Sequence, residues 1–235
     1  AGYETSAIDD IENSIRRKIP GFVRQGFFPF LSRVLSAGNH SLLRKGATLL
    51  GTLSHTSDYG FYLSNTEGND RFWRSLMNEE TLRAIGGYDP FSVTQYHYDK
   101  ADTEDHLSKI LYTDLKTYLP GDVLVKVDRM SMANSLEVRA PLLDHRVIEF
   151  AATIPGHLKY HQGQKKYILK QALAEKLPQE ILYRKKMGFS APLAQWFRRE
   201  IRVFAESNFL SHTAGLKHFF EPSALRRIWD LHQTQ

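Results

Sequence analysis

The 235-residue sequence contains no cysteine. Disulfide bonds, a thiol nucleophile and cysteine-ligated zinc are therefore excluded, and the composition fits a reducing compartment. Long hydrophobic runs are also lacking, because charged residues interrupt every apolar stretch. We therefore expect a cytoplasmic protein with no signal peptide, no transmembrane segment and no membrane partner.

The motifs that mark self-sufficient catalytic sites are also missing. The sequence has no GxxxxGKS/T phosphate loop, no GxGxxG, no HExxH and no GxSxG. His157 and His161 are spaced for one helical face, but Pro155 and Gly156 precede them and no acidic third ligand lies nearby. We therefore expect no metal site in this chain.

Charge gives little guidance to a partner. The formal net charge is +5, but Lys and Arg are interspersed with Asp and Glu rather than gathered in one basic run. We therefore expect no nucleic-acid partner. The length and the 42% hydrophobic content suffice for one core, so residues 1–235 are predicted to form a single domain.

Helical spacing of apolar residues dominates the chain, and alternating strand patterns are scarce. Ile8, Ile11, Ile15 and Ile19 predict a packing helix that ends at Pro20 and Gly21. The phenylalanines of segment 22–30 are expected in the core, followed by a short helix. The fold class predicted from these patterns is mainly α. Segment 59–63 is ambiguous between helix and strand, and residues 86–105 are predicted to form a loop. Further helices are predicted near 42–53, 70–77, 79–85, 107–118, 147–154, 167–177 and 192–229.

The run from Tyr118 to Asp144 is the most distinctive part of the sequence. Pro120 and Gly121 should break the preceding helix, and Asp122 should cap a new one. Apolar residues at helical spacing from Val123 onward predict that this second helix is buried.

Three charged residues, Lys126, Asp128 and Arg129, lie in this apolar segment and need partners or anions. One interpretation is a structural ion-pair network in the core, and the other is an anion site. A non-helical connector follows, with Glu137 and Arg139, and Asp144 should cap the next helix.

The same run resembles the signature of the synthetase domain of glutamine-dependent asparagine synthetases. There a Lys-Val-Asp-Arg helix leads into Leu-Glu-Val-Arg-Val-Pro-Phe-Leu-Asp-His, and this chain has matching residues at 126–129 and 136–145. Ala140 and Leu142 are conservative departures. The resemblance continues through GQKKYILKQAL at 163–173 and LPQEILYRKKMGFSAPL at 177–193, and is looser in the N-terminal half.

The resemblance implies a helical C-terminal portion of an α/β adenine-nucleotide α-hydrolase-like (PP-loop) synthetase domain. Such an enzyme adenylates aspartate with ATP and Mg²⁺, and ammonia released from glutamine by an upstream glutaminase domain attacks the adenylate. The Ser-Gly-Gly-x-Asp-Ser and Gly-Asp-Gly-Gly-Asp-Glu loops are absent from the sequence. The resemblance thus implies that most nucleotide contacts lie outside this chain and that the chain alone is inactive.

The resemblance also assigns site residues. Lys186 matches the lysine of an Arg-Pro-Lys loop that neutralises phosphate charge, with Arg184 as its neighbour and Lys185 in place of proline. Lys126 matches a cation near the pyrophosphate. Asp128 and Arg129 are expected to support that region. Glu137, Arg139 and Asp144 are expected to hold the architecture through ion pairs and caps.

Two alternatives to asparagine synthesis stay open from the sequence. One is an amidotransferase or β-lactam-type synthetase of the same family that acts on another carboxylate. The other is a non-catalytic helical module that binds an acidic partner. A homodimer is also compatible with the sequence.

Overall fold

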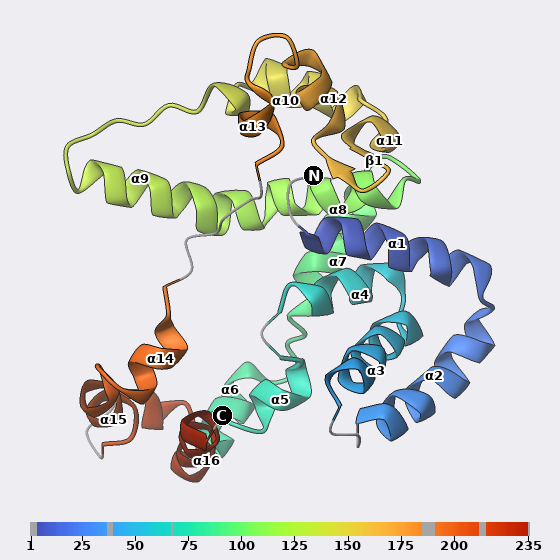
Figure 1. Ribbon diagram of the computed structural model, residues 1–235. Helices are drawn as coiled ribbons and strands as arrows, with labels where there is room; N and C mark the ends of the chain where they lie inside the picture. Colours follow the sequence, from blue (N-terminus) through green and yellow to red (C-terminus); the bar gives the residue numbers. More distant parts are fainter. Residues whose placement is uncertain (1–3, 37–39, 67, 185–190, 212–214, 235) are drawn as a thin grey trace. The chain divides into compact units, whose positions relative to one another are not determined.

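A computed structural model describes residues 4–36, 40–66, 68–184, 191–211 and 215–234. The described chain is mainly helical, as the sequence predicts (Figure 1). It divides into two compact units, one formed by residues 1–66 and 91–184 and the other by 67–90 and 185–235. None of the described helices has the length and apolar character needed to cross a membrane.

The first unit begins with four helices. The first helix ends just before Pro20 and Gly21, as predicted. The second is one uninterrupted helix that contains Pro29, where a cluster and a separate short helix were predicted. Their bounds are α1 Glu4–Lys18, α2 Gly21–Ser36, α3 Ser41–Ser54 and α4 Ser57–Ser64.

Helix α1 packs against α3, α4 and α8, as predicted, but through a different stripe. Ile8 and Ile11 are exposed, whereas Asp9 and Arg16 on the neighbouring stripe are buried. The prediction that the phenylalanines of α2 form a core is wrong, because Phe22, Phe27 and Phe30 are exposed and none of the residues of α2 is buried.

The core of the first unit lies where α4 meets α7 (Phe91–Lys100) and α8 (His106–Lys116). Phe61, Leu107 and Ile110 form its buried centre. Segment 91–100 was predicted to be a loop, but it is a helix, and the ring of Phe91 contacts those of Tyr59 and Tyr62. Asp105 caps α8 by accepting a hydrogen bond from the Ser108 amide at 2.9 Å.

The break predicted at Pro120 and Gly121 does not occur. A π-helical turn, η1 (Leu119–Val123), joins the end of α8 to α9 (Leu124–Met132), and the two helices run on from one another in Figure 1. The Leu124 amide donates to the Leu119 carbonyl, five residues earlier. This wider turn accommodates the proline, which has no amide hydrogen to donate.

The rest of the first unit consists of short elements. The connector after α9 is non-helical up to Ala140, as predicted, but a short 3₁₀ turn, η2, then precedes Asp144. The helix after Asp144 ends before Pro155 and Gly156. The strands form a small antiparallel pair in which Tyr160 lies opposite Lys165. Their bounds are η2 Pro141–Leu143, α10 His145–Thr153, α11 Gly156–Lys159, β1 Tyr160–His161, β2 Gln164–Lys165, α12 Tyr167–Ala172 and α13 Gln179–Leu182.

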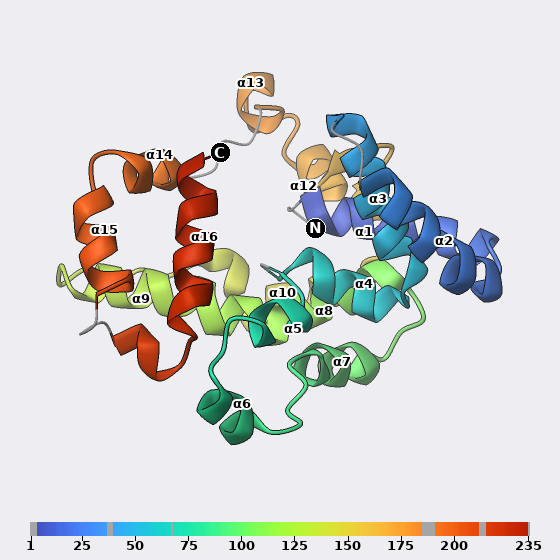
Figure 2. The same ribbon diagram turned by 90° about the horizontal axis from the view of Figure 1, so that it is seen from below.

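The second unit combines two distant parts of the chain. The Glu221 amide donates to the Leu76 carbonyl at 2.8 Å, and the Asn78 amide donates to the Phe219 carbonyl at 3.1 Å. Trp229 is buried against the rings of Phe197 and Phe209, and helices α14 and α16 lie side by side (Figure 2). The bounds are α5 Asp70–Arg74, α6 Glu79–Ile85, α14 Leu193–Arg198, α15 Arg202–Phe209, η3 Gly215–His218 and α16 Pro222–Thr234.

Candidate functional site

Helix α9, which carries the most distinctive residues of the sequence, is not a buried helix. Val127 is 45% exposed and Met130 is 62% exposed. None of the residues of α9 is buried. The prediction of a buried helix is therefore wrong for the described chain, and the charged residues of α9 have access to solvent.

Lys126 forms an ion pair within its own helical segment. Its Nζ lies 3.0 Å from Oδ1 of Asp122, one helical turn earlier. Both side chains are largely exposed. Asp122 thus serves as the partner of Lys126 and not as the predicted helix cap.

A pocket of about 440 Å³ lies between α9 and the connector that follows it. Its described lining residues are apolar except for Asp128. The lining residues are Leu124, Val125, Val127, Asp128, Val138, Ala140 and Leu143.

The other charged residues of this region pair locally. Glu137 and Arg139 form an exposed pair in which Arg139 Nη2 lies 2.7 Å from Glu137 Oε1. Asp144 caps α10 by accepting from the Arg146 amide at 2.9 Å, and it also pairs with the Arg146 guanidinium. Hydrogen bonds from Arg146 lower the pKa of Asp144.

Asp128 and Arg129 form no ion pair with any residue that the structure describes. The interpretation of this segment as an ion-pair network in the core is therefore wrong for the described chain.

The basic loop after α13 is only partly within the described residues. Arg184 is exposed at the end of the first unit. Lys185 and Lys186 lie outside the described residues. No described contact joins Arg184 to Lys126. Among the described side chains, no group of three or more His, Asp or Glu residues is placed to hold a metal ion.

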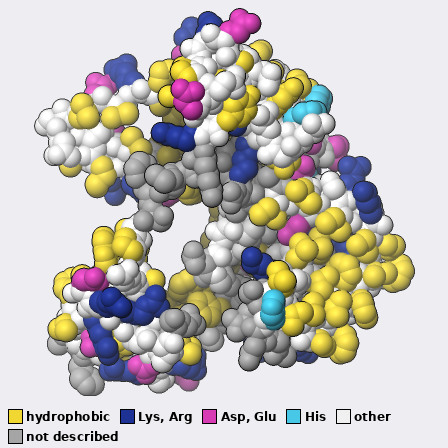
Figure 3. Space-filling view, viewed as in Figure 1, with side chains coloured by type: hydrophobic (Ala, Val, Ile, Leu, Met, Phe, Trp, Pro, Cys, Tyr) yellow, Lys and Arg dark blue, Asp and Glu magenta, His cyan; other side chains and the backbone are white. Residues whose placement is uncertain are grey.

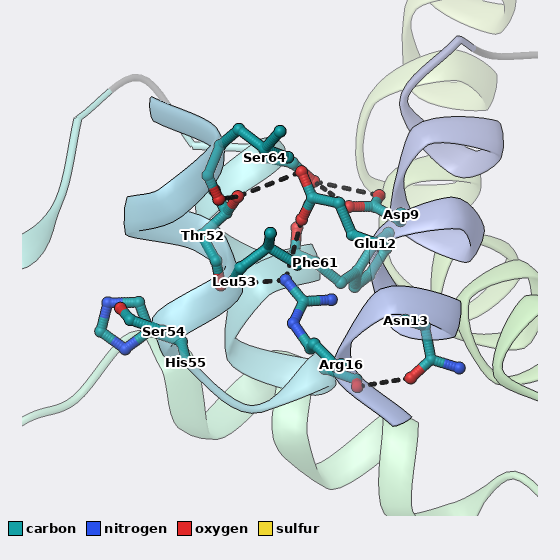
Figure 4. Close-up of polar contacts among 12 residues, drawn as sticks. Asp9, Glu12, Asn13, Arg16, Thr52, Leu53, Ser54, His55, Phe61 and Ser64 are labelled. Carbon is teal, nitrogen blue, oxygen red and sulfur yellow. Dashed lines mark hydrogen bonds and ion pairs between the residues drawn. The ribbon is translucent and has the colours of Figure 1, made fainter. Parts of the chain in front are cut away.

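Sequence reasoning missed a buried polar network between α1, α3 and α4 (Figure 4). Arg16 Nη2 donates to Glu12 Oε2 at 2.8 Å and to the Thr52 carbonyl at 3.0 Å. The Thr52 hydroxyl donates to Glu12 at 3.0 Å, and the Ser64 hydroxyl donates to Asp9 at 3.1 Å. The signal in the sequence was a second, polar stripe at helical spacing beside the isoleucines of α1.

Burial changes the acidity of several groups in and beside this network. It raises the pKa of Asp9 to about 7, against a lowering effect of the hydrogen bond from Ser64. It raises the pKa of Asp114 to about 6. It lowers the pKa of His106, whose Nδ1 lies 2.7 Å from the Tyr98 hydroxyl, to about 4. Because these groups lie inside the helix packing, we assign them to the framework and not to a substrate site.

The whole chain matches one family of proteins. The family model described as asparagine synthase covers residues 1–235. No solved structure gives a significant match.

Several curated proteins are similar to parts of the chain. Asparagine synthetase (glutamine-hydrolyzing) 1 of Bacillus subtilis is 35% identical over 144 residues, which are 60% of this chain and 22% of that protein. A putative asparagine synthetase of Mycobacterium bovis is 34% identical over 80% of this chain and 28% of its own length. Asparagine synthetase (glutamine-hydrolyzing) 3 of B. subtilis is 51% identical over 81 residues, which are 34% of this chain and 13% of that protein.

The alignments therefore cover only about a quarter of the length of the first two relatives. The family match, in contrast, extends over every residue of this chain. The chain belongs to the asparagine synthase family.

Proposed function

We propose that the protein to which this chain belongs makes asparagine from aspartate, ATP and ammonia released from glutamine. The single observation that carries this proposal is the family match over residues 1–235. We further propose that the chain forms the helical C-terminal part of an α/β PP-loop synthetase domain. In this arrangement the chain is one fragment of the synthetase domain. The nucleotide-binding loops and a glutaminase domain belong to a part of the protein that is N-terminal to it.

The proposed reaction has two steps. A carboxylate oxygen of aspartate attacks the α-phosphorus of ATP, which forms β-aspartyl-adenylate and releases pyrophosphate. Ammonia then attacks the activated carbonyl carbon, AMP leaves with the attacking carboxylate oxygen, and a proton is released. The charge that builds up on the phosphates in the first step is stabilised by fixed positive charge.

This chain offers three cations for that role: Lys186 first, then Lys126, with Arg184 beside the loop. Lys126 is available because its pair with Asp122 is exposed, and exposed pairs are worth about 0–1 kcal/mol. A phosphate group can therefore replace Asp122 at little cost. Lysine suits the task because its ammonium group is a compact charge on a flexible side chain.

Asp128 and Arg129 on α9, and Glu137, Arg139 and Asp144 beyond it, would support the region and not react. Asp144 does so in a defined way, because it caps α10 directly after the connector. Among the described residues, no group of three or more His, Asp or Glu is placed to hold a metal ion. We propose that Mg²⁺ reaches the site with ATP and through residues outside this chain. A cytoplasmic location and a homodimer remain parts of the proposal.

The test is pyrophosphate release by the intact protein with ATP, Mg²⁺ and a panel of carboxylic acids. We expect release with aspartate, and asparagine as the product when glutamine or ammonia is added. The isolated chain should release none, and its turnover would contradict the proposal that nucleotide contacts lie outside it.

The panel also separates the alternatives. Release with another carboxylate but not with aspartate would favour a family member of different specificity. No release with any acid, together with salt-sensitive binding of an acidic partner, would favour a non-catalytic module.

A further inference from the structure

The hairpin of α2 and α3 presents a hydrophobic surface to solvent. Figure 3 shows hydrophobic side chains gathered over α2 and the adjoining part of α3. Phe22 is 80% exposed and Phe30 is 63% exposed, which is unusual for large aromatic side chains in water. We call this surface the hairpin face. Its exposed apolar residues are Phe22, Phe27, Phe30, Val34, Leu42 and Leu49.

Helix α2 is apolar on two sides. Its inner side lies against α3, where the Ser32 hydroxyl donates to the Ala47 carbonyl at 2.7 Å and Leu35 approaches Gly46. Its outer side carries the exposed phenylalanines. The described chain covers the inner side only.

The charge around the hairpin face has one sign. No Asp or Glu occurs between Glu12 and Asp58, whereas this interval contains seven Lys and Arg residues. Arg16 and Arg24 are tied to backbone carbonyls inside the unit. Four others have exposed side chains and no ion pair with any described residue: Arg17, Lys18, Arg33 and Lys45.

These cations lie near the ends of α1, α2 and α3. Arg17 and Lys18 end α1, directly before α2 begins, and Arg33 lies in the last turn of α2. Lys45 lies near the start of α3. Figure 3 shows dark blue side chains at the edge of the hydrophobic group, close to the end of α1.

We propose that the hairpin face docks on an anionic lipid bilayer surface. Exposed Phe and Leu side chains enter the boundary between headgroups and acyl chains, and the flanking Arg and Lys side chains contact anionic headgroups. This inference goes beyond the proposed function. It also departs from our expectation of no membrane partner, because that expectation rested on the lack of a spanning segment and surface docking needs none.

The charge pattern is what favours lipid over a protein. An anionic bilayer presents negative headgroups all around an inserted apolar surface, so cations that flank that surface gain attraction. A second copy of this chain would bring the same cations into contact with one another, which is unfavourable.

Cosedimentation of the intact protein with vesicles tests the proposal, because binding then also requires that no other part of the protein covers the hairpin face. One set of vesicles contains phosphatidylcholine alone, and the other is an equal mixture with phosphatidylglycerol. We expect binding to the mixed vesicles, much weaker binding to the neutral ones, and a loss of binding as salt is raised. Equal binding to both sets, or binding to neither, would overturn the proposal.

Charge reversal gives a matched comparison. Arg17→Glu with Lys18→Glu should lower the partition onto mixed vesicles by about fivefold or more for each side chain. The control is Arg226→Glu with Arg227→Glu, an adjacent and exposed pair on α16, which changes the net charge equally. If the control lowered binding as much, the effect would be one of net charge and the hairpin face would not be the docking surface.

The apolar contribution is tested by Phe22→Ser with Phe30→Ser. We expect a loss of roughly tenfold for each phenylalanine. The control is Phe150→Ser with Phe204→Ser, which removes two phenylalanines of similar exposure elsewhere. Circular dichroism checks folding, and Val34→Ser serves as a milder variant. Unchanged binding in the hairpin variants, or a vesicle-free dimer that they dissociate, would overturn the proposal.

Discussion

Gly60 of α4 lies directly against the guanidinium of Arg16 of α1, so close that a Cβ at position 60 would overlap Nη2. The side chain of Arg16 is only 3% exposed, and its Nη2 is held by Glu12 and by the Thr52 carbonyl. The lack of a side chain at position 60 therefore gives α1 and α4 the spacing that this buried ion pair requires.

Gly60→Ala should destabilise the first unit by about 2 kcal/mol, because Arg16 must give up buried hydrogen bonds. Helix propensity alone predicts the opposite, since alanine favours helices over glycine by about 1 kcal/mol. The control is Gly26→Ala in α2, where nothing lies near the added Cβ. Denaturant unfolding measures both variants, and a stabilised Gly60→Ala variant would refute the role of this contact.

The stability of the first unit should depend on the protonation of Asp9. Burial raises its pKa to about 7, so the folded state keeps a proton that the unfolded state loses near the usual value of 3.8. The free energy of unfolding should therefore fall as the pH rises between these values. The charges of Glu12 and Asp114 raise the pKa of Asp9 further, and the charge of Arg16 lowers it.

Asp9→Asn should remove this component of the pH dependence. Relative to the parent chain, the variant should gain on the order of 2 kcal/mol between about pH 5 and about pH 8. His106, whose lowered pKa gives the opposite slope below about 6.5, is common to both proteins and cancels in the difference. A constant difference between the two proteins across this range would contradict the assignment.

The Tyr98 hydroxyl should stabilise the fold through His106. His106 is buried, and the atoms Tyr98 Oη and His106 Nδ1 lie 2.7 Å apart. Tyr98→Phe leaves Nδ1 without that partner and should cost about 1–2 kcal/mol. Tyr96→Phe on the same helix is the control, because its hydroxyl contacts only the exposed Lys100 among the described residues. Thermal unfolding that ranks the two variants equally would contradict the prediction.

Some of the fold follows from local chemistry. Pro20 with Gly21 ends a helix, and Asp144 caps one, because these effects depend on neighbours within a few residues. The buried face of α1 could not be predicted in this way. Its polar stripe is buried through partners such as Thr52 and Ser64, which lie 40 and 55 residues further along the chain.

In the candidate site, too, some features could be predicted from the sequence and others could not. The residue pattern identified the family, and the family model confirms it. The exposure of Val127 could not be predicted, because periodicity marks an apolar face but does not say what covers it. The sequence predicted a helix break at Pro120, but the helix continues there because a π-helical turn does not need the amide hydrogen that proline lacks.

The assigned roles of the cations are open to a direct test in the intact protein. Lys186→Ala should lower aspartate-dependent pyrophosphate release about a hundredfold or more, as loss of one transition-state contact typically does. Lys126→Ala should have a smaller effect, and Lys185→Ala a milder one still. The melting temperature should barely move in these variants, because the lysines are assigned to meet phosphate and not to hold the fold. Near-normal release by Lys186→Ala, or its unfolding, would refute the assignment.

The central claim is that the intact protein activates aspartate as an adenylate. The most direct measurement uses aspartate labelled with ¹⁸O in its side-chain carboxylate, together with ATP and ammonia, and follows the label by mass spectrometry. Adenylate formation predicts that one labelled oxygen appears in AMP for each asparagine formed. Label in inorganic phosphate, or unlabelled AMP alongside asparagine, would contradict the account.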